Sequence, residues 1–358
     1  MTMSARCIKV LIVEDSQVCR ELLNHIYSSD PGIQVMGTAS NGDEALAFLK
    51  HATPDVISMD IQMPGMNGYE ATRAIMSTHP LPIVIVSSSF SRDEVAASFL
   101  AIQAGAVALH SKPKGPGHPD YATMAASLIE TIKVMSEVNV VRRWNRKGEA
   151  ARTPSSNGQA RSVAEPDDIR IRMVAIGVST GGPPVLHTIL SGLPKSFPVP
   201  IVIVQHIAAG FLEGLRDWLT QTTGYPVEIP GHGDLPRAGH AYLAPDGMHL
   251  GFDASGHFAL SLAAPENGLR PSVAHLFRSV AGVFGDAAIG VMLTGMGRDG
   301  AEELKLMKDR GAVTIAQDKE SSVVHGMPGE AIDLRAVTHV LPPERISLVL
   351  PNLVRRHS

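Results

Sequence analysis

Short runs of apolar residues alternate with amphipathic stretches through the first 135 residues of the chain. In the stretches, apolar residues recur every three or four positions, which predicts helices, the last at about 120–138. The runs are four to seven residues long and rich in β-branched residues, which predicts strands at 8–13, 33–39, 55–60, 82–88 and 106–111. Five alternations of strand and helix predict a doubly wound α/β domain, with a parallel sheet covered on both faces.

The second half of the chain repeats this pattern. Its apolar runs predict strands at 172–178, 200–206, 241–245, 288–295 and 312–318. Helices are predicted near 183–193, 210–222, 271–284, 300–310 and 328–335. We therefore expect a second α/β domain with a parallel or mixed sheet. Because open sheets of this kind bind ligands at the carboxyl ends of their strands, the residues that follow each run are the candidates for function.

The pattern fails between residues 139 and 169, where proline, glycine and serine cluster. We expect a first domain at 1–138, a linker at 139–169 and a second domain at 170–352. Between Arg142 and Arg161 the linker carries six basic residues against one acidic residue. A solvated tether explains this charge, and a binding surface for an acidic partner is the alternative.

Composition narrows the class of protein. The 358 residues are 44% hydrophobic and 18% charged, as in globular α/β proteins, and a formal net charge of −4 gives no reason to expect a nucleic acid partner. Cys7 and Cys19, the only cysteines, are too few for a disulfide framework or a zinc site. The N-terminal segment lacks a cleavable signal and no apolar run reaches about 18 residues, so we expect a cytoplasmic protein that is not embedded in a membrane.

Three carboxylates follow predicted strands of the first half. Glu14 and Asp15 come after the first strand and Asp60 after the third, so in a doubly wound sheet they are neighbours and form a hard-oxygen site suited to Mg²⁺. Ser87 ends the fourth strand and Lys112 follows the fifth. Singly, these residues could cap a helix, begin a turn or lie on the surface. Together, from almost every strand end and in the right order, they favour a functional site over these separate explanations.

The stretches VLIVEDS, MDIQMPGMNG, VSSS and SKP make about 125 residues resemble the receiver domain of two-component response regulators, which has a five-stranded, flavodoxin-like fold. The resemblance implies that Asp60 accepts a phosphoryl group from a chemotaxis histidine kinase, with Ser87 as the switch hydroxyl and Lys112 as the phosphate partner. Leu109 stands where many receivers have an aromatic residue, so we expect coupling through the surface of the fourth and fifth strands and helices. The Mg²⁺ ligands implied are Glu14, Asp15, Asp60 and the carbonyl of Gln62.

A second constellation begins at Gly177-Val178-Ser179-Thr180-Gly181, a G-x-S-x-G pattern between a predicted strand and helix. It could expose Ser179 as a nucleophile. Ser179 or Thr180 could equally cap the helix, and a dinucleotide-binding loop is a third hypothesis. The next strand ends in Gln205 and His206 rather than in an acid for a ribose hydroxyl, which weakens the dinucleotide hypothesis.

His206 is a candidate general base because it ends the strand that follows Ser179. Asp299, after a third strand, supplies an acid, although Asp299-Gly300-Ala301-Glu302 also fits a capping box for the next helix. A serine, a histidine and an aspartate on one rim are the parts of a hydrolytic triad. Their chain order differs from that of the α/β-hydrolases, so the serine motif does not imply that fold.

The stretches AIGVSTGGPP, IVIVQH, AYLAPDGMHL, LTGMGRDGA and TIAQDKESSVVHGMP make residues 170 to 350 resemble the catalytic domain of the CheB family, the chemotaxis receptor-glutamate methylesterases. The resemblance implies a Rossmann-like domain with Ser179 as nucleophile, His206 as base and Asp299 as the residue that orients it. Main-chain N–H groups near Thr180 and Met296 are candidate oxyanion donors.

The same resemblance implies a reaction and partners. The substrates would be glutamate methyl esters on methyl-accepting chemotaxis receptors, with methanol released, no cofactor for ester hydrolysis, and possible deamidation of receptor glutamines. It further implies a monomer whose unphosphorylated receiver covers the active site. Two alternatives stay open at the sequence level: a receptor-docking module without turnover, and the same esterase in another signalling array.

Overall fold

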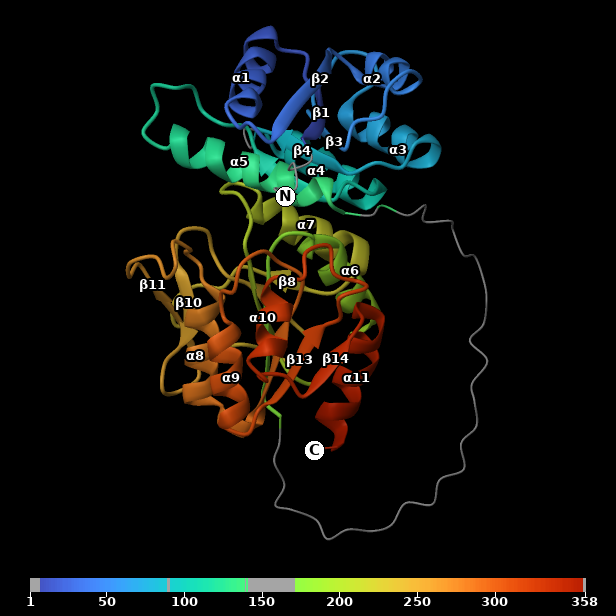
Figure 1. Cartoon of the computed structure of the whole chain (residues 1–358). Helices are drawn as coiled ribbons and strands as arrows, with labels where there is room; N and C mark the ends of the chain where they lie inside the picture. Colours follow the sequence, from blue (N-terminus) through green and yellow to red (C-terminus); the bar gives the residue numbers. More distant parts are fainter. Residues whose placement is uncertain (1–6, 89–90, 139, 141–170, 357–358) are drawn as a thin grey trace, which may run out of the picture.

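The computed structural model describes residues 7–88, 91–138, 140 and 171–356, which form two α/β bodies (Figure 1). The first body has a five-stranded parallel sheet in the order β2-β1-β3-β4-β5. Its strands are β1 (Ile8–Val13), β2 (Ile33–Ala39), β3 (Val56–Met59), β4 (Ile83–Ser87) and β5 (Ala108–Ser111). All five lie where the apolar runs predicted them, and the order is the doubly wound one.

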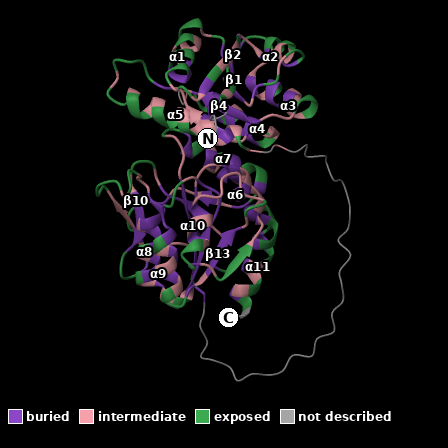
Figure 2. Cartoon of the chain, in the orientation of Figure 1, coloured by how far each residue is buried: buried purple, intermediate pink, exposed green. Residues whose placement is uncertain are grey.

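Helices cover both faces of this sheet, as expected. Alternate residues of β1 point to opposite faces: Leu11 and Val13 pack on the side of α2, α3 and α4, whereas Val10 and Ile12 pack on the side of α1 and α5. The strands are buried and the outer helix faces exposed (Figure 2). The helices are α1 (Gln17–Ser28), α2 (Gly42–Leu49), α3 (Gly68–Thr78), α4 (Arg92–Ala104) and α5 (Tyr121–Ser136).

The second body has a seven-stranded sheet in the order β14-β13-β12-β6-β7-β9-β8, with every pair parallel. A separate antiparallel hairpin is formed by β10 and β11. The main sheet is therefore parallel rather than mixed. The strands are β6 (Met173–Val178), β7 (Ile201–Gln205), β8 (Val227–Glu228), β9 (Ala241–Leu243), β10 (His249–Phe252), β11 (Phe258–Ser261), β12 (Ala288–Met292), β13 (Val313–Gln317) and β14 (His339–Leu341).

Helices also cover both faces of the larger sheet. Val174 and Ile176 of β6 pack with α6, α7 and α11, and Met173 and Ala175 pack with α8, α9 and α10. All five helices predicted for this domain are present. The sequence did not predict α11, which has Pro351 inside it. The helices are α6 (Gly182–Gly192), α7 (Leu212–Thr223), α8 (Val273–Val283), α9 (Ala301–Asp309), α10 (Met327–Asp333) and α11 (Pro343–Arg356), with a short η1 (Gly285–Ala287).

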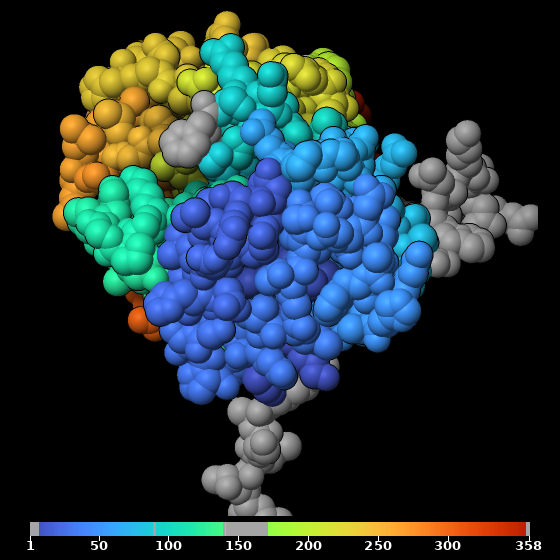
Figure 3. Space-filling model, turned by 90° about the horizontal axis from the view of Figure 1, so that it is seen from above, coloured from blue at the N-terminus to red at the C-terminus, as the bar shows by residue number. Residues whose placement is uncertain are grey.

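The two bodies meet where α4 of the first packs against α7 of the second. Val95 and Phe99 of α4 are buried in the same cluster as the core of the second body. The rings of Phe99 and Trp218 stack with centroids 5.7 Å apart. A Cβ at Gly214 would lie 2.1 Å from Val95 Cγ1, so only glycine permits this approach. Seen from above, the first body lies over the second (Figure 3).

Most of the expected linker, and with it the predicted domain boundaries, lies outside the described residues. Among the helices in the described part of the chain, none is both long and apolar enough to cross a membrane.

Candidate functional site

The three members of the predicted triad follow three neighbouring strands. Ser179 follows β6 and His206 follows β7, while Asp299 lies between β12 and α9. Because the sheet order is β12-β6-β7, their carboxyl ends form one continuous rim. Main-chain hydrogen bonds extend the sheet into this rim: Ser179 N–H donates to the Thr294 carbonyl at 3.0 Å, and His206 N–H donates to the Val178 carbonyl at 2.9 Å.

The turn that holds Ser179 is built around glycines. Gly181 has a φ of +77°, a conformation that costs other residues free energy. It is also the N-cap of α6 and makes no side-chain capping hydrogen bond. Neither Ser179 nor Thr180 therefore caps the helix, and the capping hypothesis for this stretch is wrong.

Asp299 is held by the N-terminus of another helix. Its Oδ2 accepts from Val273 N–H at 2.6 Å and its Oδ1 from Ala274 N–H at 3.2 Å, both in the first turn of α8. The N-cap of α9 is Gly300, without a side-chain capping bond, so Asp299 does not form the capping box that its sequence suggested. Two of the main-chain N–H groups that α8 leaves without a partner in the helix thus fix the position of this carboxylate.

The same carboxylate contacts the predicted base. Asp299 Oδ2 lies 3.0 Å from His206 Nε2, with both side chains largely buried. This contact is close but lacks the alignment of a hydrogen bond. Among the described residues, no hydrogen bond joins Ser179 Oγ to the His206 ring. Catalytic hydrogen bonds are often loose without substrate, so the missing bond does not argue against these residues as a candidate triad.

A hollow of about 460 Å³ lies over this rim and is walled by both bodies. Ser179, His206 and Met296 line it from the second body, and Leu109 and His110 of β5 line it from the first. Thr180 also lines the hollow, so both candidate oxyanion donors are beside Ser179. Residues of the first body therefore line the space next to Ser179.

The first body has its own charged rim. Glu14, Asp15 and Asp60 each place a carboxylate oxygen within 4.8 Å of the others. Lys112 Nζ lies 2.9 Å from Asp60 Oδ2 and 3.0 Å from Glu14 Oε2. Glu14 and Asp60 are buried, whereas Asp15 and Gln62 are exposed. The structure thus brings together the acids and the lysine that the sequence selected, with Gln62 two residues beyond Asp60.

Burial and neighbouring charges raise the pKa of two of these carboxylates. Burial, and then the charge of Asp60, raises the pKa of Glu14 to about 7, against the lowering effect of Lys112. Burial also raises the pKa of Asp60, again opposed by Lys112. Glu14 Oε2 is buried without an aligned hydrogen bond. Three carboxylates facing one ammonium group leave room for a divalent cation, and the all-oxygen ligand set fits Mg²⁺.

Ser87 contacts a residue that the sequence did not single out. Its Oγ donates to Glu94 Oε1 at 2.7 Å, and Ser88 donates to the same oxygen through both N–H and Oγ. Glu94 is only 4% exposed. In the sequence, Ser91 and Glu94 match a capping box for α4, and Ser91 Oγ does accept from Glu94 N–H at 3.1 Å. This local pattern does not reveal that the Glu94 carboxylate also contacts Ser87 at the end of β4.

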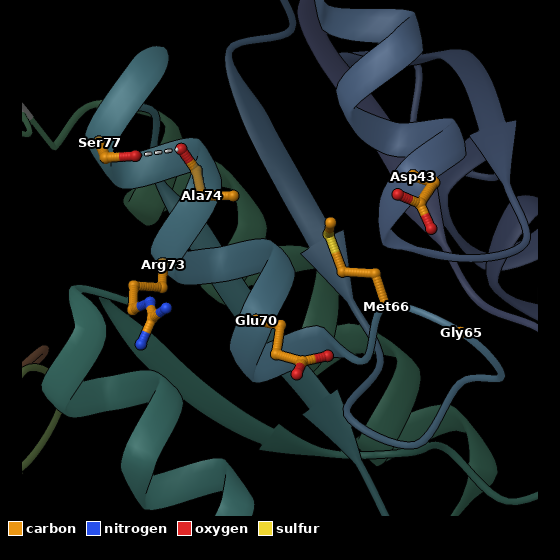
Figure 4. Close-up of a pocket in the computed structure, with 7 residues that line it drawn as sticks. All are labelled: Asp43, Gly65, Met66, Glu70, Arg73, Ala74 and Ser77. Carbon is orange, nitrogen blue, oxygen red and sulfur yellow. Dashed lines mark hydrogen bonds between the residues drawn. The ribbon is translucent and has the colours of Figure 1, made fainter.

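Another hollow, of about 540 Å³, lies between α2 and α3 of the first body (Figure 4). Asp43, Glu70 and Arg73 give it a charged wall beside Gly65 and Met66. It contains none of the residues of either rim, and it therefore belongs to neither candidate site.

Comparison with known proteins identifies a family for each body. The family model described as CheB methylesterase matches residues 174–350, and the response regulator receiver domain matches residues 10–118. Relatives named protein-glutamate methylesterase/protein-glutamine glutaminase occur in Geobacter metallireducens (52% identical over 97% of this chain and 99% of that protein) and Nitrosospira multiformis (53%, 97% and 97%).

A solved structure supports the assignment of the second body. The crystal structure of the Thermotoga maritima CheB methylesterase catalytic domain is 39% identical and covers 52% of this chain and 100% of that domain, with a TM-score of 0.50. Near full-length similarity to named relatives and the matches of both family models lead to one conclusion. The chain belongs to the CheB family of protein-glutamate methylesterases that carry a receiver domain.

Proposed function

We propose that Ser179, His206 and Asp299 catalyse the methylesterase reaction of this protein, the hydrolysis of glutamate methyl esters on methyl-accepting chemotaxis receptors. The observation that carries the proposal is the rim itself: three neighbouring strand ends present a serine, an imidazole and a carboxylate fixed by α8. The relatives are named as enzymes, so the receptor-docking module without turnover has no support.

The imidazole acts as base through the nitrogen that does not face Asp299. Because Asp299 Oδ2 lies beside Nε2, the proton on Nε2 is favoured and Nδ1 is left to accept a proton. His206 takes the Ser179 proton as Oγ attacks the ester carbonyl, and returns it to the departing methoxide as methanol. Water, deprotonated by the same imidazole, then hydrolyses the acyl-enzyme to glutamate. With a glutamine side chain, ammonia leaves instead.

The oxyanion formed in each step needs donors beside Ser179. The main-chain N–H groups of Thr180 and Met296 line the same hollow and donate to no carbonyl within the described residues. Preformed donors of this kind stabilise charge that develops only in the transition state. We assign them this role, which requires no cofactor.

Phosphorylation of Asp60 regulates this site in our proposal. The phosphodonor is a chemotaxis histidine kinase, and Asp60 Oδ attacks its phosphoryl group. Mg²⁺, held by Glu14, Asp15, Asp60 and the Gln62 carbonyl, would neutralise charge on the phosphoryl oxygens. Lys112 Nζ, already 2.9 Å from Asp60 Oδ2, pairs with the product phosphate.

Coupling to the esterase follows from α4. The phosphoryl oxygens compete with Glu94 for the Ser87 hydroxyl. Losing that donor leaves Glu94 Oε1 with the two donors of Ser88 and weakens the tie between β4 and the first turn of α4. Val95 and Phe99, on the next turns of the same helix, form the contact with α7. Moving α4 therefore weakens the contact that keeps the receiver over Ser179. The linker at 139–169, between domains at 1–138 and 170–352, would serve as the hinge.

The remaining features of the proposal are a cytoplasmic location and a monomeric state. Both fit a protein that approaches the cytoplasmic helices of receptors through a single active-site face.

The decisive experiment measures methanol release from radiolabelled, methylated receptor membranes. Wild type and Ser179→Ala are compared with and without a small phosphodonor. We expect release by wild type, stimulated by the phosphodonor, and none above background from the variant. Equal release by the two proteins would contradict the assignment of the nucleophile.

A further inference from the structure

Gln205, the last residue of β7, joins the main chains of the two reacting residues. Its Nε2 donates to the Ser179 carbonyl at 2.8 Å and to the His206 carbonyl at 2.8 Å. The side chain is 4% exposed and lines the hollow over the triad. Both partners of Nε2 are carbonyl oxygens, which can only accept, and Oε1 is buried without a hydrogen-bond partner in the described part of the chain. The amide nitrogen must therefore face them, and both of its hydrogens are used.

This bridge lies beyond the last rung of the sheet. The ladder between β6 and β7 ends with His206 N–H donating to the Val178 carbonyl. Past that point, Ser179 and His206 enter separate loops, and Gln205 is the side chain that connects their carbonyls. Buried hydrogen bonds of this kind fix geometry, since a carbonyl left unpaired in such a site costs about 1 to 3 kcal/mol.

Gly182 leaves room for this side chain. A Cβ on Gly182 would lie 2.2 Å from Gln205 Oε1 and 2.5 Å from Val178 Cγ2. The N–H of Gly182 also donates to the Ser179 carbonyl at 3.0 Å, so that carbonyl receives two donors. Gly182, directly after the serine motif, and Gln205, directly before His206, thus fit one another.

We propose that Gln205 is a positioning residue that sets the distance between the Ser179 hydroxyl and the His206 imidazole. It touches no reacting atom and acts by clamping the two carbonyls, with Gly182 providing the space. A loss of the clamp displaces nucleophile and base relative to each other, and a displacement of about 1 Å costs on the order of 100-fold in rate. This inference rests on the proposed roles of Ser179 and His206.

The test uses the full chain, saturated with a small phosphodonor, carrying Gln205→Met. Methionine keeps the length and burial and removes both donors. We expect kcat for methanol release to fall about 10- to 100-fold with KM nearly unchanged. Labelling of Ser179 by a small phosphonate, which reports serine reactivity without receptor binding, should slow in parallel. Unchanged kcat and labelling would overturn the proposal.

Two further variants separate positioning from folding. Thr314→Val removes a buried hydroxyl of β13 that bonds Thr338, the residue before β14, away from the rim. It should lower the thermal midpoint without lowering kcat. Gly182→Ala should displace Gln205, so its effect and that of Gln205→Met should be much less than additive when combined. Additive effects would show that Gly182 and Gln205 act separately, against the clamp.

Ser179→Ala in the same assays distinguishes the two levels of inference. If it abolishes release while Gln205→Met is as active as wild type, only the clamp is wrong. If Ser179→Ala remains active, the proposed nucleophile itself is wrong.

Discussion

The two domains place a buried aspartate at the same position, the carboxyl end of a parallel strand, and give it different surroundings. Asp60 is near two other carboxylates and one lysine ammonium group. Asp299 faces two main-chain N–H groups of α8 and an imidazole. A side-chain ammonium group thus faces Asp60, whereas main-chain dipoles face Asp299.

This difference fits the two roles that we propose, phosphorylation of Asp60 and orientation of His206 by Asp299. The Lys112 charge and a bound cation can pair again with a phosphoryl group on Asp60, so the reaction leaves no charge unpaired. The two N–H groups that hold Asp299 belong to the main chain of α8, so in the proposed mechanism the carboxylate stays beside His206 and orients it. The position after a strand places each aspartate on a rim, and the groups around it determine which chemistry it can support.

The largest effect is expected from Asp299→Asn. An amide cannot replace the charge beside His206, and its N–H₂ group would face the Val273 or Ala274 N–H. We expect methanol release to fall on the order of 10⁴-fold, as in other triads. Asp253→Asn is a matched control, because Asp253 also accepts from two main-chain N–H groups, of Ser255 and His257, outside the rim. A similar loss in both variants would mean that Asp299 acts only through stability.

Asp60→Asn should remove regulation and spare the triad. We expect basal methanol release close to that of wild type and no stimulation by a small phosphodonor.

Deleting residues 1–165 should instead raise basal release, because the wall of the hollow formed by β5 and α5 is removed. An unchanged rate in the isolated second domain would contradict autoinhibition by the receiver.

Glu94→Gln should have a smaller effect in the same direction as the deletion. The amide still accepts from Ser87, but a charge-assisted hydrogen bond becomes a neutral one, at a cost of about 1 kcal/mol. We expect basal release to rise about fivefold or less without a phosphodonor. Glu70→Gln is the control, since Glu70 holds the same position in the capping box of α3 and lies far from α7. Equal rises in both variants would argue against coupling through Ser87.

The sequence predicted the strands of both domains because their apolar runs are long and buried on both faces. It missed β8 and β14, with two and three residues, and the hairpin of β10 and β11, which lies outside the main sheet. Short strands carry too few residues for a period to stand out.

The candidate sites followed from strand ends for the same reason, since every selected side chain comes directly after an apolar run or within a few residues of it. The sequence did not identify Glu94 and Gln205 as candidate functional residues. Glu94 resembles a helix cap, and Gln205 is one polar residue at the end of a buried strand. Their partners, Ser87 and the carbonyl of Ser179, become neighbours only when the chain folds, so no local pattern reveals them.

The smallest expected effect concerns Mg²⁺ and pH. With its pKa raised by burial to about 7, Glu14 in the metal-free protein binds a proton more tightly when folded than when unfolded. The stability it contributes is full below about pH 4.5, the unfolded pKa, and is lost as the pH rises through about 7. Mg²⁺ requires the ionised form, so Mg²⁺ should raise the thermal midpoint more at pH 8 than at pH 6.

Glu14→Gln isolates this group, because the difference between wild type and variant cancels the other titrating residues. In the variant, the Mg²⁺-induced shift should be smaller and almost independent of pH between 6 and 8. Scanning calorimetry with and without Mg²⁺ at both pH values measures it. If the variant retained the full pH dependence, the proton that competes with Mg²⁺ would belong to another carboxylate. The contrast between the rim of Asp60 and the rim of Asp299 would then depend on Asp15 and Asp60 and not on Glu14.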